Sequence, residues 1–109
     1  ASDTCIMPYV SKVIVGTGIK NVGGYAFAGD TGLKEIILPN SITSINEYSF
    51  MYCTNLSNIT IPEKVTNIGV QAFYGCTNLI KVKILATDTT VRTDAFRPIA
   101  HNSKIYVLN

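Results

Sequence analysis

Three cysteines, Cys5, Cys53 and Cys76, carry the most reactive side chains of this 109-residue chain. Cys53 and Cys76 are 23 residues apart, and a fold that repeats with this period would place their Cα atoms about 5 Å apart, within the range of a disulfide. However, an odd number of cysteines without a CxxC pair predicts neither a disulfide framework nor a zinc site. We therefore interpret Cys53 and Cys76 as free, buried thiols, and Cys5 as a cap residue or an exposed thiol.

Catalytic chemistry has weak support in the sequence. The single histidine is His101, and Asp88 and Asp94 lie near one another without a nucleophile or base beside them. The glycines of residues 16–24 are not followed by the Lys-Ser/Thr pair of a phosphate-binding loop. We therefore expect no enzymatic activity, no metal and no cofactor.

Two asparagines match the glycosylation acceptor pattern, in Asn55-Leu-Ser57 and Asn58-Ile-Thr60. Both lie in repeated positions rich in Asn and Thr, so we interpret the match as chance. Asn55 shares its position with Asn78 one repeat later. We expect these amides to hydrogen-bond the backbone of the turns.

The elements that must position these side chains repeat every 23 residues. Phe27, Phe50, Phe73 and Phe96 follow this step, and several apolar columns share it. Such a period is typical of a solenoid, in which each turn, here called a lap, buries its apolar edge against its neighbours. Two of the columns are Val13, Ile36, Ile59, Val82 and Ile105, and Val15, Leu38, Ile61, Ile84 and Val107.

Each lap begins with a short alternation, as in Ile59-Thr-Ile61, which is typical of a strand with one buried face. Pro62 ends this strand, and Gly69 permits a bend on the return path. Laps stacked about 4.8 Å apart predict a parallel sheet. The expected strands are 12–15, 35–38, 58–61, 81–84 and 104–107, within a domain over residues 12–109 that follows a cap, or the tail of a preceding repeat, at residues 1–11.

Composition excludes several classes of protein. Hydrophobic residues make up 47% of the chain, charged residues 15%, and the net charge is +2. Nucleic-acid binding normally requires a clustered basic face, so we expect no nucleic-acid partner. No apolar run approaches the roughly 20 residues of a membrane span, so the chain is not expected to cross a membrane.

The unit Leu-x-x-Ile-x-Ile-Pro-x-x-Val-x-x-Ile-Gly-x-x-Ala-Phe-x-Gly-Cys-x-x-Leu, clearest from Leu56 to Leu79, resembles the BspA-like leucine-rich repeat family over about residues 10–107. The resemblance implies an α/β-type, strand-dominated, right-handed leucine-rich repeat solenoid with about four 23-residue repeats and a parallel sheet on its concave face. It also implies an extracellular or cell-surface bacterial protein, of a kind implicated in adhesion. The family offers no common catalytic residues to carry over.

In a leucine-rich repeat, the outward residues of the strands face the concave side, where these proteins usually bind. We call this set the sheet stripe, and we expect it to contact a protein or a glycan on a host cell or matrix. Its basic C-terminal part favours an acidic ligand, whereas the alternative is a solvated sheet face whose lysines discourage aggregation. The sheet stripe comprises Lys12, Ile14, Glu35, Ile37, Asn58, Thr60, Lys81, Lys83, Lys104 and Tyr106.

Four tyrosines, Tyr25, Tyr48, Tyr52 and Tyr74, fall on the return path of the laps. Tyr25 and Tyr48 share a column, which indicates partial burial with surface hydroxyls or, alternatively, a second aromatic patch. The sequence as a whole favours a non-catalytic binding module. The alternatives are a spacer or stalk and a substrate-targeting domain of a larger surface enzyme, and no oligomeric state is indicated.

Overall fold

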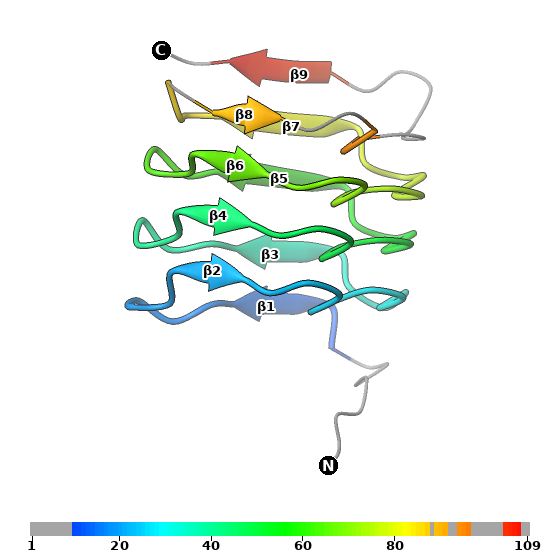
Figure 1. Ribbon diagram of the computed structural model, residues 1–109. Coiled ribbons are helices and arrows are strands. Elements are labelled where there is room, and N and C mark those ends of the chain that lie inside the picture. Colours follow the sequence, from blue (N-terminus) through cyan, green and yellow to red (C-terminus); the bar gives the residue numbers. More distant parts are fainter. Residues whose placement is uncertain (1–9, 88, 92–93, 97–103, 108–109) are drawn as a thin grey trace.

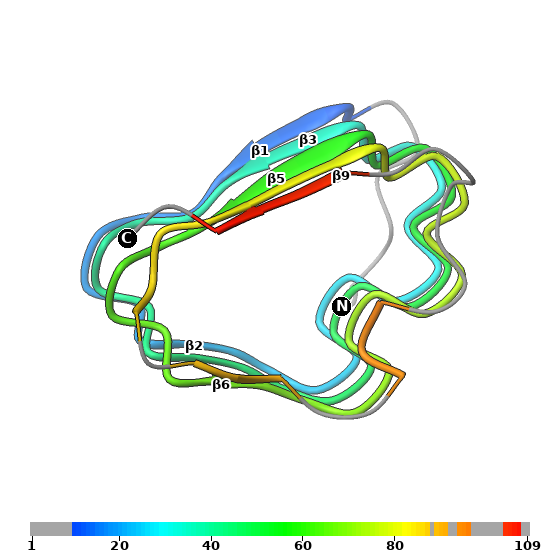
Figure 2. The ribbon, with the colours of Figure 1, turned by 90° about the horizontal axis from the view of Figure 1, so that it is seen from above.

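The chain forms two parallel sheets that stand on opposite sides of a solenoid (Figures 1 and 2). The computed structural model describes residues 10–87, 89–91, 94–96 and 104–107. These residues form strands and turns, and none of them lies in a helix that could span a membrane. The first sheet has the order β1-β3-β5-β7-β9 and the second the order β2-β4-β6-β8. The bounds are β1 (Lys12–Ile14), β2 (Asn21–Val22), β3 (Glu35–Ile37), β4 (Ser44–Ile45), β5 (Asn58–Ile61), β6 (Asn67–Ile68), β7 (Lys81–Ile84), β8 (Thr90–Val91) and β9 (Lys104–Val107).

Neighbouring strands pair in a register of 23 residues in both sheets. In the first sheet Lys12 pairs with Glu35 and Asn58 pairs with Lys81; in the second Asn21 pairs with Ser44. This register follows from the side-chain alternation, because a slip of one residue would turn every buried side chain to the solvent. The predicted strand-dominated solenoid with a parallel sheet is therefore confirmed.

The strand bounds differ from the predicted ranges at the N-terminal end of the sheet. β5, β7 and β9 coincide with the expected ranges, whereas β1 and β3 end one residue earlier, at Ile14 and Ile37. The backbone nitrogen of Val15 still donates to the oxygen of Ile37, at 3.0 Å. The predicted cap at residues 1–11 lies almost entirely outside the described residues.

The second sheet was not predicted. Each of its strands has only two residues. Two residues are too few to produce an alternating pattern in the sequence. Threonines reinforce this side of the solenoid, since the hydroxyl of Thr66 donates to the backbone oxygen of Thr43 at 3.3 Å.

The turn after each short strand contains the phenylalanine column. Its backbone folds in successive tight turns, in which Ala26 donates to Gly23 and Asp30 donates to Phe27, both at 3.1 Å. Contacts also run to the next lap, as where Phe27 donates to the oxygen of Ser49 at 2.7 Å. These hydrogen bonds satisfy the backbone of an irregular segment that would otherwise be costly to bury.

The core is a continuous column between the two sheets. Phe50 and Phe73 are fully buried, and their rings stack with centroids 5.1 Å apart and nearly parallel planes. Phe27 and Phe96 extend this stack at its two ends and are partly buried. The described laps thus share one hydrophobic core, as expected when a single lap cannot cover its own apolar edge.

Among the described residues, two columns of the turn adopt left-handed backbone conformations, which cost non-glycine residues free energy. They recur at the 23-residue period, so they belong to the geometry of the turn. Glycine meets this requirement at only two of the seven positions, and three of the others are tyrosine. The first column is Tyr25, Tyr48, Gln71 and Asp94, with φ between 51° and 67°, and the second is Gly29, Tyr52 and Gly75, with φ between 61° and 77°.

Candidate functional site

The register of the first sheet brings the sheet stripe together as two parallel rows on one face. One row runs through Lys12, Glu35, Asn58, Lys81 and Lys104, and the other through Ile14, Ile37, Thr60, Lys83 and Tyr106. The alternation in β5, with Asn58 and Thr60 exposed and Ile59 and Ile61 buried, leaves the side chains of the sheet stripe on the outer surface. The side chain of Lys104 lies outside the described residues.

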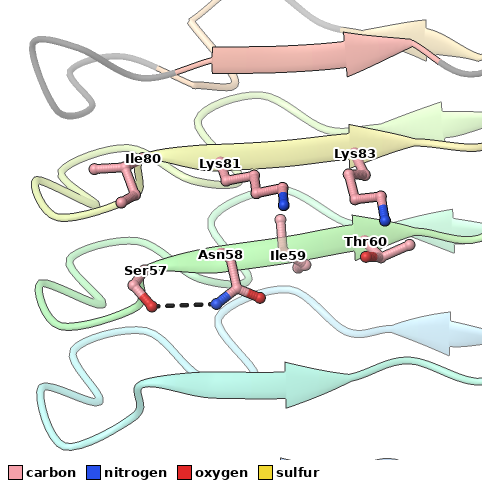
Figure 3. A pocket seen from close by; sticks show the side chains of 7 residues that line it. All are labelled: Ser57, Asn58, Ile59, Thr60, Ile80, Lys81 and Lys83. Atoms are coloured by element: carbon pink, nitrogen blue, oxygen red, sulfur yellow. Dashed lines mark hydrogen bonds between the residues drawn. The ribbon is translucent and has the colours of Figure 1, made fainter.

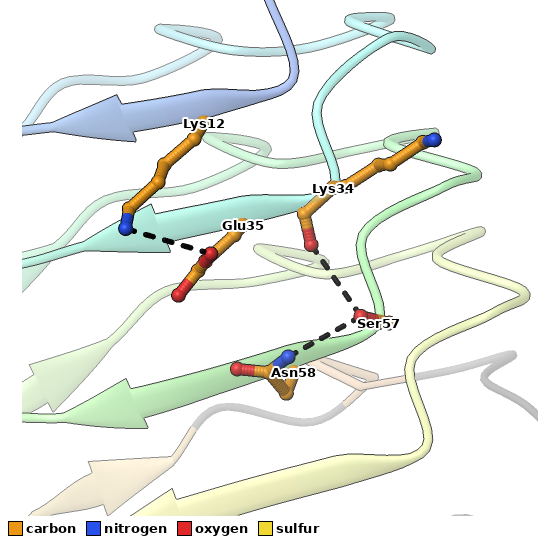
Figure 4. A network of polar contacts seen from close by, with 5 residues as sticks. All are labelled: Lys12, Lys34, Glu35, Ser57 and Asn58. Carbon is orange, nitrogen blue, oxygen red and sulfur yellow. Dashed lines mark hydrogen bonds and ion pairs between the residues drawn. The ribbon is translucent and has the colours of Figure 1, made fainter.

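The N-terminal part of the sheet stripe is apolar and its charges are paired. Ile14 and Ile37 are 70% and 43% exposed. The Nζ of Lys12 lies 3.9 Å from Oε1 of Glu35 (Figure 4). An exposed ion pair of this kind contributes little to stability, but it neutralises the single carboxylate of the sheet stripe. This part therefore offers a ligand mainly hydrophobic contacts.

The middle of the sheet stripe is hollowed between β5 and β7. A hollow of about 370 Å³ is lined by polar and basic side chains and two isoleucines, from these two strands and the residues just before them (Figure 3). Ser57 and Ile80 were missed by the sequence analysis because they precede the strands, where the alternation has not begun. The lining residues are Ser57, Asn58, Ile59, Thr60, Ile80, Lys81 and Lys83.

A second hollow of about 220 Å³ opens beside the first on the same sheet. Asn58 and Thr60 line both hollows, so the two form a continuous depression across the strands. The second hollow also includes Ile37 and Asn40. Polar contacts within the depression hold Asn58 in place, because its amide nitrogen donates to the hydroxyl of Ser57 at 3.2 Å (Figure 4).

The C-terminal part of the sheet stripe combines basic and aromatic side chains. The Nζ of Lys81 lies 5.8 Å from the centroid of the Tyr106 ring, within the range of a cation–π interaction. Tyr106 is opposite Lys83 in the sheet and is 41% exposed. A ligand that reaches this end would meet two ammonium groups next to an aromatic ring.

Positive charge is concentrated on the sheet stripe. It contains four of the nine basic residues of the chain and one of the seven acidic residues. The remaining positions contain five basic and six acidic residues, so the rest of the chain has a slight negative charge. The small net charge of the chain therefore conceals one basic face.

Cys53 and Cys76 are free and buried, as predicted. Each thiol donates to the backbone oxygen of a phenylalanine in the preceding lap, Cys53 to Phe27 at 3.0 Å and Cys76 to Phe50 at 3.1 Å. Burial raises the pKa of both thiols to about 12, and for Cys53 the proximity of Cys76 acts in the same direction. These side chains form part of the core, and Cys5 lies outside the described residues.

The other candidate residues do not assemble into a reactive site. His101 and Asp88 lie outside the described residues, and within the described part no group of three His, Cys, Asp or Glu side chains could hold a metal ion. The amide of Asn55 donates to the backbone oxygen of Thr31 at 2.6 Å. This bond supports the predicted role of that asparagine in the turn.

The tyrosines form two pairs on the turns. Tyr25 and Tyr48 stack with ring centroids 4.9 Å apart, whereas Tyr52 and Tyr74 meet edge to face at 5.6 Å. Tyr25 and Tyr52 are 59% and 49% exposed. The sequence had left open whether Tyr25 and Tyr48 form an aromatic patch, and the structure has them in contact at the surface.

Stacked 23-residue laps, two parallel sheets and an exposed row of side chains along one sheet define a leucine-rich repeat solenoid. The model of the family described as BspA type leucine rich repeat region (6 copies) matches residues 7–107, and the chain belongs to this family. No curated protein matches the chain.

Two solved structures resemble the chain. A leucine rich cell surface protein from Faecalibacterium prausnitzii A2-165 is 35% identical over 69% of the chain, with a TM-score of 0.66. A leucine-rich repeat protein from Bacteroides ovatus ATCC 8483 is 27% identical over 92% of the chain, with a TM-score of 0.58. The matches cover only 20% and 30% of those two proteins.

Proposed function

We propose that this repeat module binds an acidic ligand, a protein segment or a glycan of a host cell or matrix, along the sheet stripe and without chemistry. The observation that carries the proposal is the depression across β3, β5 and β7, which adjoins the basic end of the sheet stripe. The similar protein from Faecalibacterium prausnitzii is described as a cell surface protein. By analogy we propose that this module also acts outside the cell.

The proposed contact assigns three roles to the sheet stripe and the depression in it. Lys81 and Lys83 attract and orient acidic groups, and the hydroxyls and amide of Ser57, Asn58 and Thr60 form hydrogen bonds in the depression. Ile14 and Ile37 add apolar area at the other end. Opposite charges speed the encounter and select the partner more than they raise affinity, so we expect binding that weakens as the salt concentration rises.

A charge reversal tests this proposal. The chain would be screened against sulfated and sialylated glycans and acidic extracellular proteins, and then compared with the double variant Lys81→Glu/Lys83→Glu. We expect affinity to fall at least about tenfold, which corresponds to about 1.4 kcal/mol. The matched control is Lys20→Glu/Lys64→Glu, which makes the same change in net charge away from the sheet stripe and should bind normally.

Two outcomes would contradict the proposal. Equal binding by the charge-reversed variant and the parent chain would remove the sheet stripe from the contact. The absence of saturable binding to any ligand in the screen would favour the alternative role, in which the laps are a spacer that holds another domain away from the cell.

A further inference from the structure

A third hollow is lined by residues of the short strand β6 and of the chain that follows β4 and β6. These short strands stand on the side of the solenoid opposite the sheet stripe (Figure 2). The hollow has a volume of about 380 Å³ and lies where the chain leaves β4 and β6. Its lining residues are Glu47, Tyr48, Asn67, Gly69 and Val70. None of these residues belongs to the sheet stripe, and the proposed function above does not use them.

Aromatic surface borders this hollow in an unusual backbone setting. Tyr48 lines the hollow, and the partly exposed ring of Tyr25 stacks against it. Both tyrosines have left-handed backbones, with φ of 59° and 61°. Glycine or asparagine adopts that conformation more readily. The turn itself therefore does not account for two tyrosines at this position.

Two polar side chains of the hollow, Glu47 and Asn67, face it from different laps. Within the described part of the chain, the carboxylate of Glu47 and the amide of Asn67 form neither a side-chain hydrogen bond nor an ion pair. Glu47 is exposed and Asn67 is partly exposed. A carboxylate accepts hydrogen bonds and an amide both donates and accepts them. Together with Tyr48 they provide one flat apolar ring and two unoccupied hydrogen-bonding groups around one hollow.

We propose that this hollow is a second binding site, which takes an uncharged sugar ring of an oligosaccharide. The C–H groups on one face of a pyranose are apolar and would lie against the aromatic surface, while its hydroxyls would bond to Glu47 and Asn67. An acidic sugar does not fit, because Glu47 is the only charged residue of the lining. A cationic peptide fits less well, because the two rings stack on each other and do not surround a common centre.

Titration with neutral oligosaccharides tests the site directly. Soluble oligomers of glucose, mannose and N-acetylglucosamine would be added to the ¹⁵N-labelled chain while backbone amide shifts are recorded. We expect saturable shifts at Tyr48 and Val70, with a Kd on the order of 1 mM for the best sugar. The amides of Asn58 and Lys81 should not move.

Tyr48→Asn is the most informative variant, because asparagine suits the left-handed backbone and removes only the ring. We expect it to lose binding, while Tyr48→Phe keeps it and Glu47→Gln weakens it several-fold. Tyr52→Asn makes the same exchange in the same backbone conformation on another turn and should bind normally. Lys81→Glu/Lys83→Glu should also bind normally, which separates this site from the sheet stripe.

Three results would overturn the inference. One is the absence of saturable shifts with every sugar, and another is unchanged binding by a folded Tyr48→Asn variant. The third is binding of a lysine-rich peptide in place of the sugars, lost in Glu47→Gln and in high salt, which would make the hollow a cation site. None of these results bears on an acidic ligand at the sheet stripe.

Discussion

At the scale of single residues, Gly69 marks the closest approach between two laps among the described glycines that have ordinary backbone angles. A Cβ atom there would lie 2.6 Å from the backbone nitrogen of Glu47 and 2.9 Å from the carbonyl carbon of Asn46. Backbone atoms cannot move aside as a flexible side chain can. Gly23 occupies the same position two laps earlier, and a Cβ atom added there would have no other atom within 4 Å.

We therefore expect Gly69→Ala to destabilise the chain by about 1–3 kcal/mol, the usual cost of overpacking a tight site. Gly23→Ala is the matched control and should change the free energy of unfolding by less than about 0.5 kcal/mol. Urea unfolding followed by circular dichroism measures both. If Gly69→Ala lowered the free energy of unfolding as little as Gly23→Ala, the laps would not be in close contact at Gly69.

A further prediction at the scale of single residues concerns the reactivity of the two buried cysteines. Reagents attack the thiolate, and a thiol with a pKa of about 12 is almost wholly protonated at neutral pH. In a Cys5→Ser background, we expect Cys53 and Cys76 to resist labelling in the native chain and to react at once in denaturant. Rapid native labelling at neutral pH would contradict their burial.

The same thiols make stability depend on pH in a defined direction. Their pKa is higher in the folded chain than the ordinary value of 9.0, so the folded state binds their protons more tightly. This contribution is complete below about pH 9 and is lost as the pH rises from 9 towards 12. Urea unfolding would be measured for both chains at increasing pH. Between pH 9 and 12, the free energy of unfolding should therefore fall more steeply for the Cys5→Ser chain than for Cys5→Ser/Cys53→Ala/Cys76→Ala.

At the scale of elements, the phenylalanine column connects the laps by direct ring contacts in addition to the strand pairing. Its rings stack at 4.9–5.3 Å with interplanar angles of 2–6°. Phe50 and Phe73 therefore each touch a ring in the laps on either side, while Phe27 and Phe96 each touch one. Because the inner rings are fully buried and Phe27 is only partly buried, the members of the column should differ in their contribution to stability.

We expect Phe73→Ala to cost about 3–5 kcal/mol, since it leaves a cavity between two laps. Phe27→Ala should cost clearly less, because the ring is already partly exposed. Thermal and urea unfolding of the two variants give this comparison. An equal loss of stability in both variants would indicate that the phenylalanine column stabilises the fold through the backbone of the turn and not through ring packing.

The long strands could be predicted from the sequence, and the short ones could not. The alternation Asn58-Ile59-Thr60-Ile61 assigns each side chain to one face, and the 23-residue step then sets the pairing. In β6, by contrast, Asn67 and Ile68 are bonded to their neighbours only because the long strands already hold the laps in place. Tertiary context, rather than local sequence, decides that second sheet.

At the scale of the whole molecule, the sequence predicted which residues share a face but not the shape of that face. The register places Asn58, Thr60, Lys81 and Lys83 together. The hollow between them also needs Ser57 and Ile80, whose positions depend on how the chain enters the strands. The sequence placed Tyr25 and Tyr48 in one column, but the hollow beside Tyr48 was not predicted, because a left-handed backbone at a tyrosine gives no pattern in the sequence.

The first sheet and the hollow beside Tyr48 also differ in the chemistry of their side chains. The first sheet presents lysines and one paired carboxylate, while the hollow beside Tyr48 contains a carboxylate and an aromatic ring. The two sheets lie on opposite sides of one core (Figure 2). If both proposed sites bind, a single small module contacts two ligands of different chemistry without competition between them.

The strict 23-residue register has a consequence for how such a gene can change. Duplicating one whole lap would add a strand to each sheet and reproduce the same junctions, whereas inserting a single residue within a long strand would turn the following apolar side chains to the solvent. Unequal recombination between neighbouring repeats can therefore lengthen or shorten the module without disrupting it. The reach of its surface can evolve in steps of one lap, while the residues within each lap diversify independently.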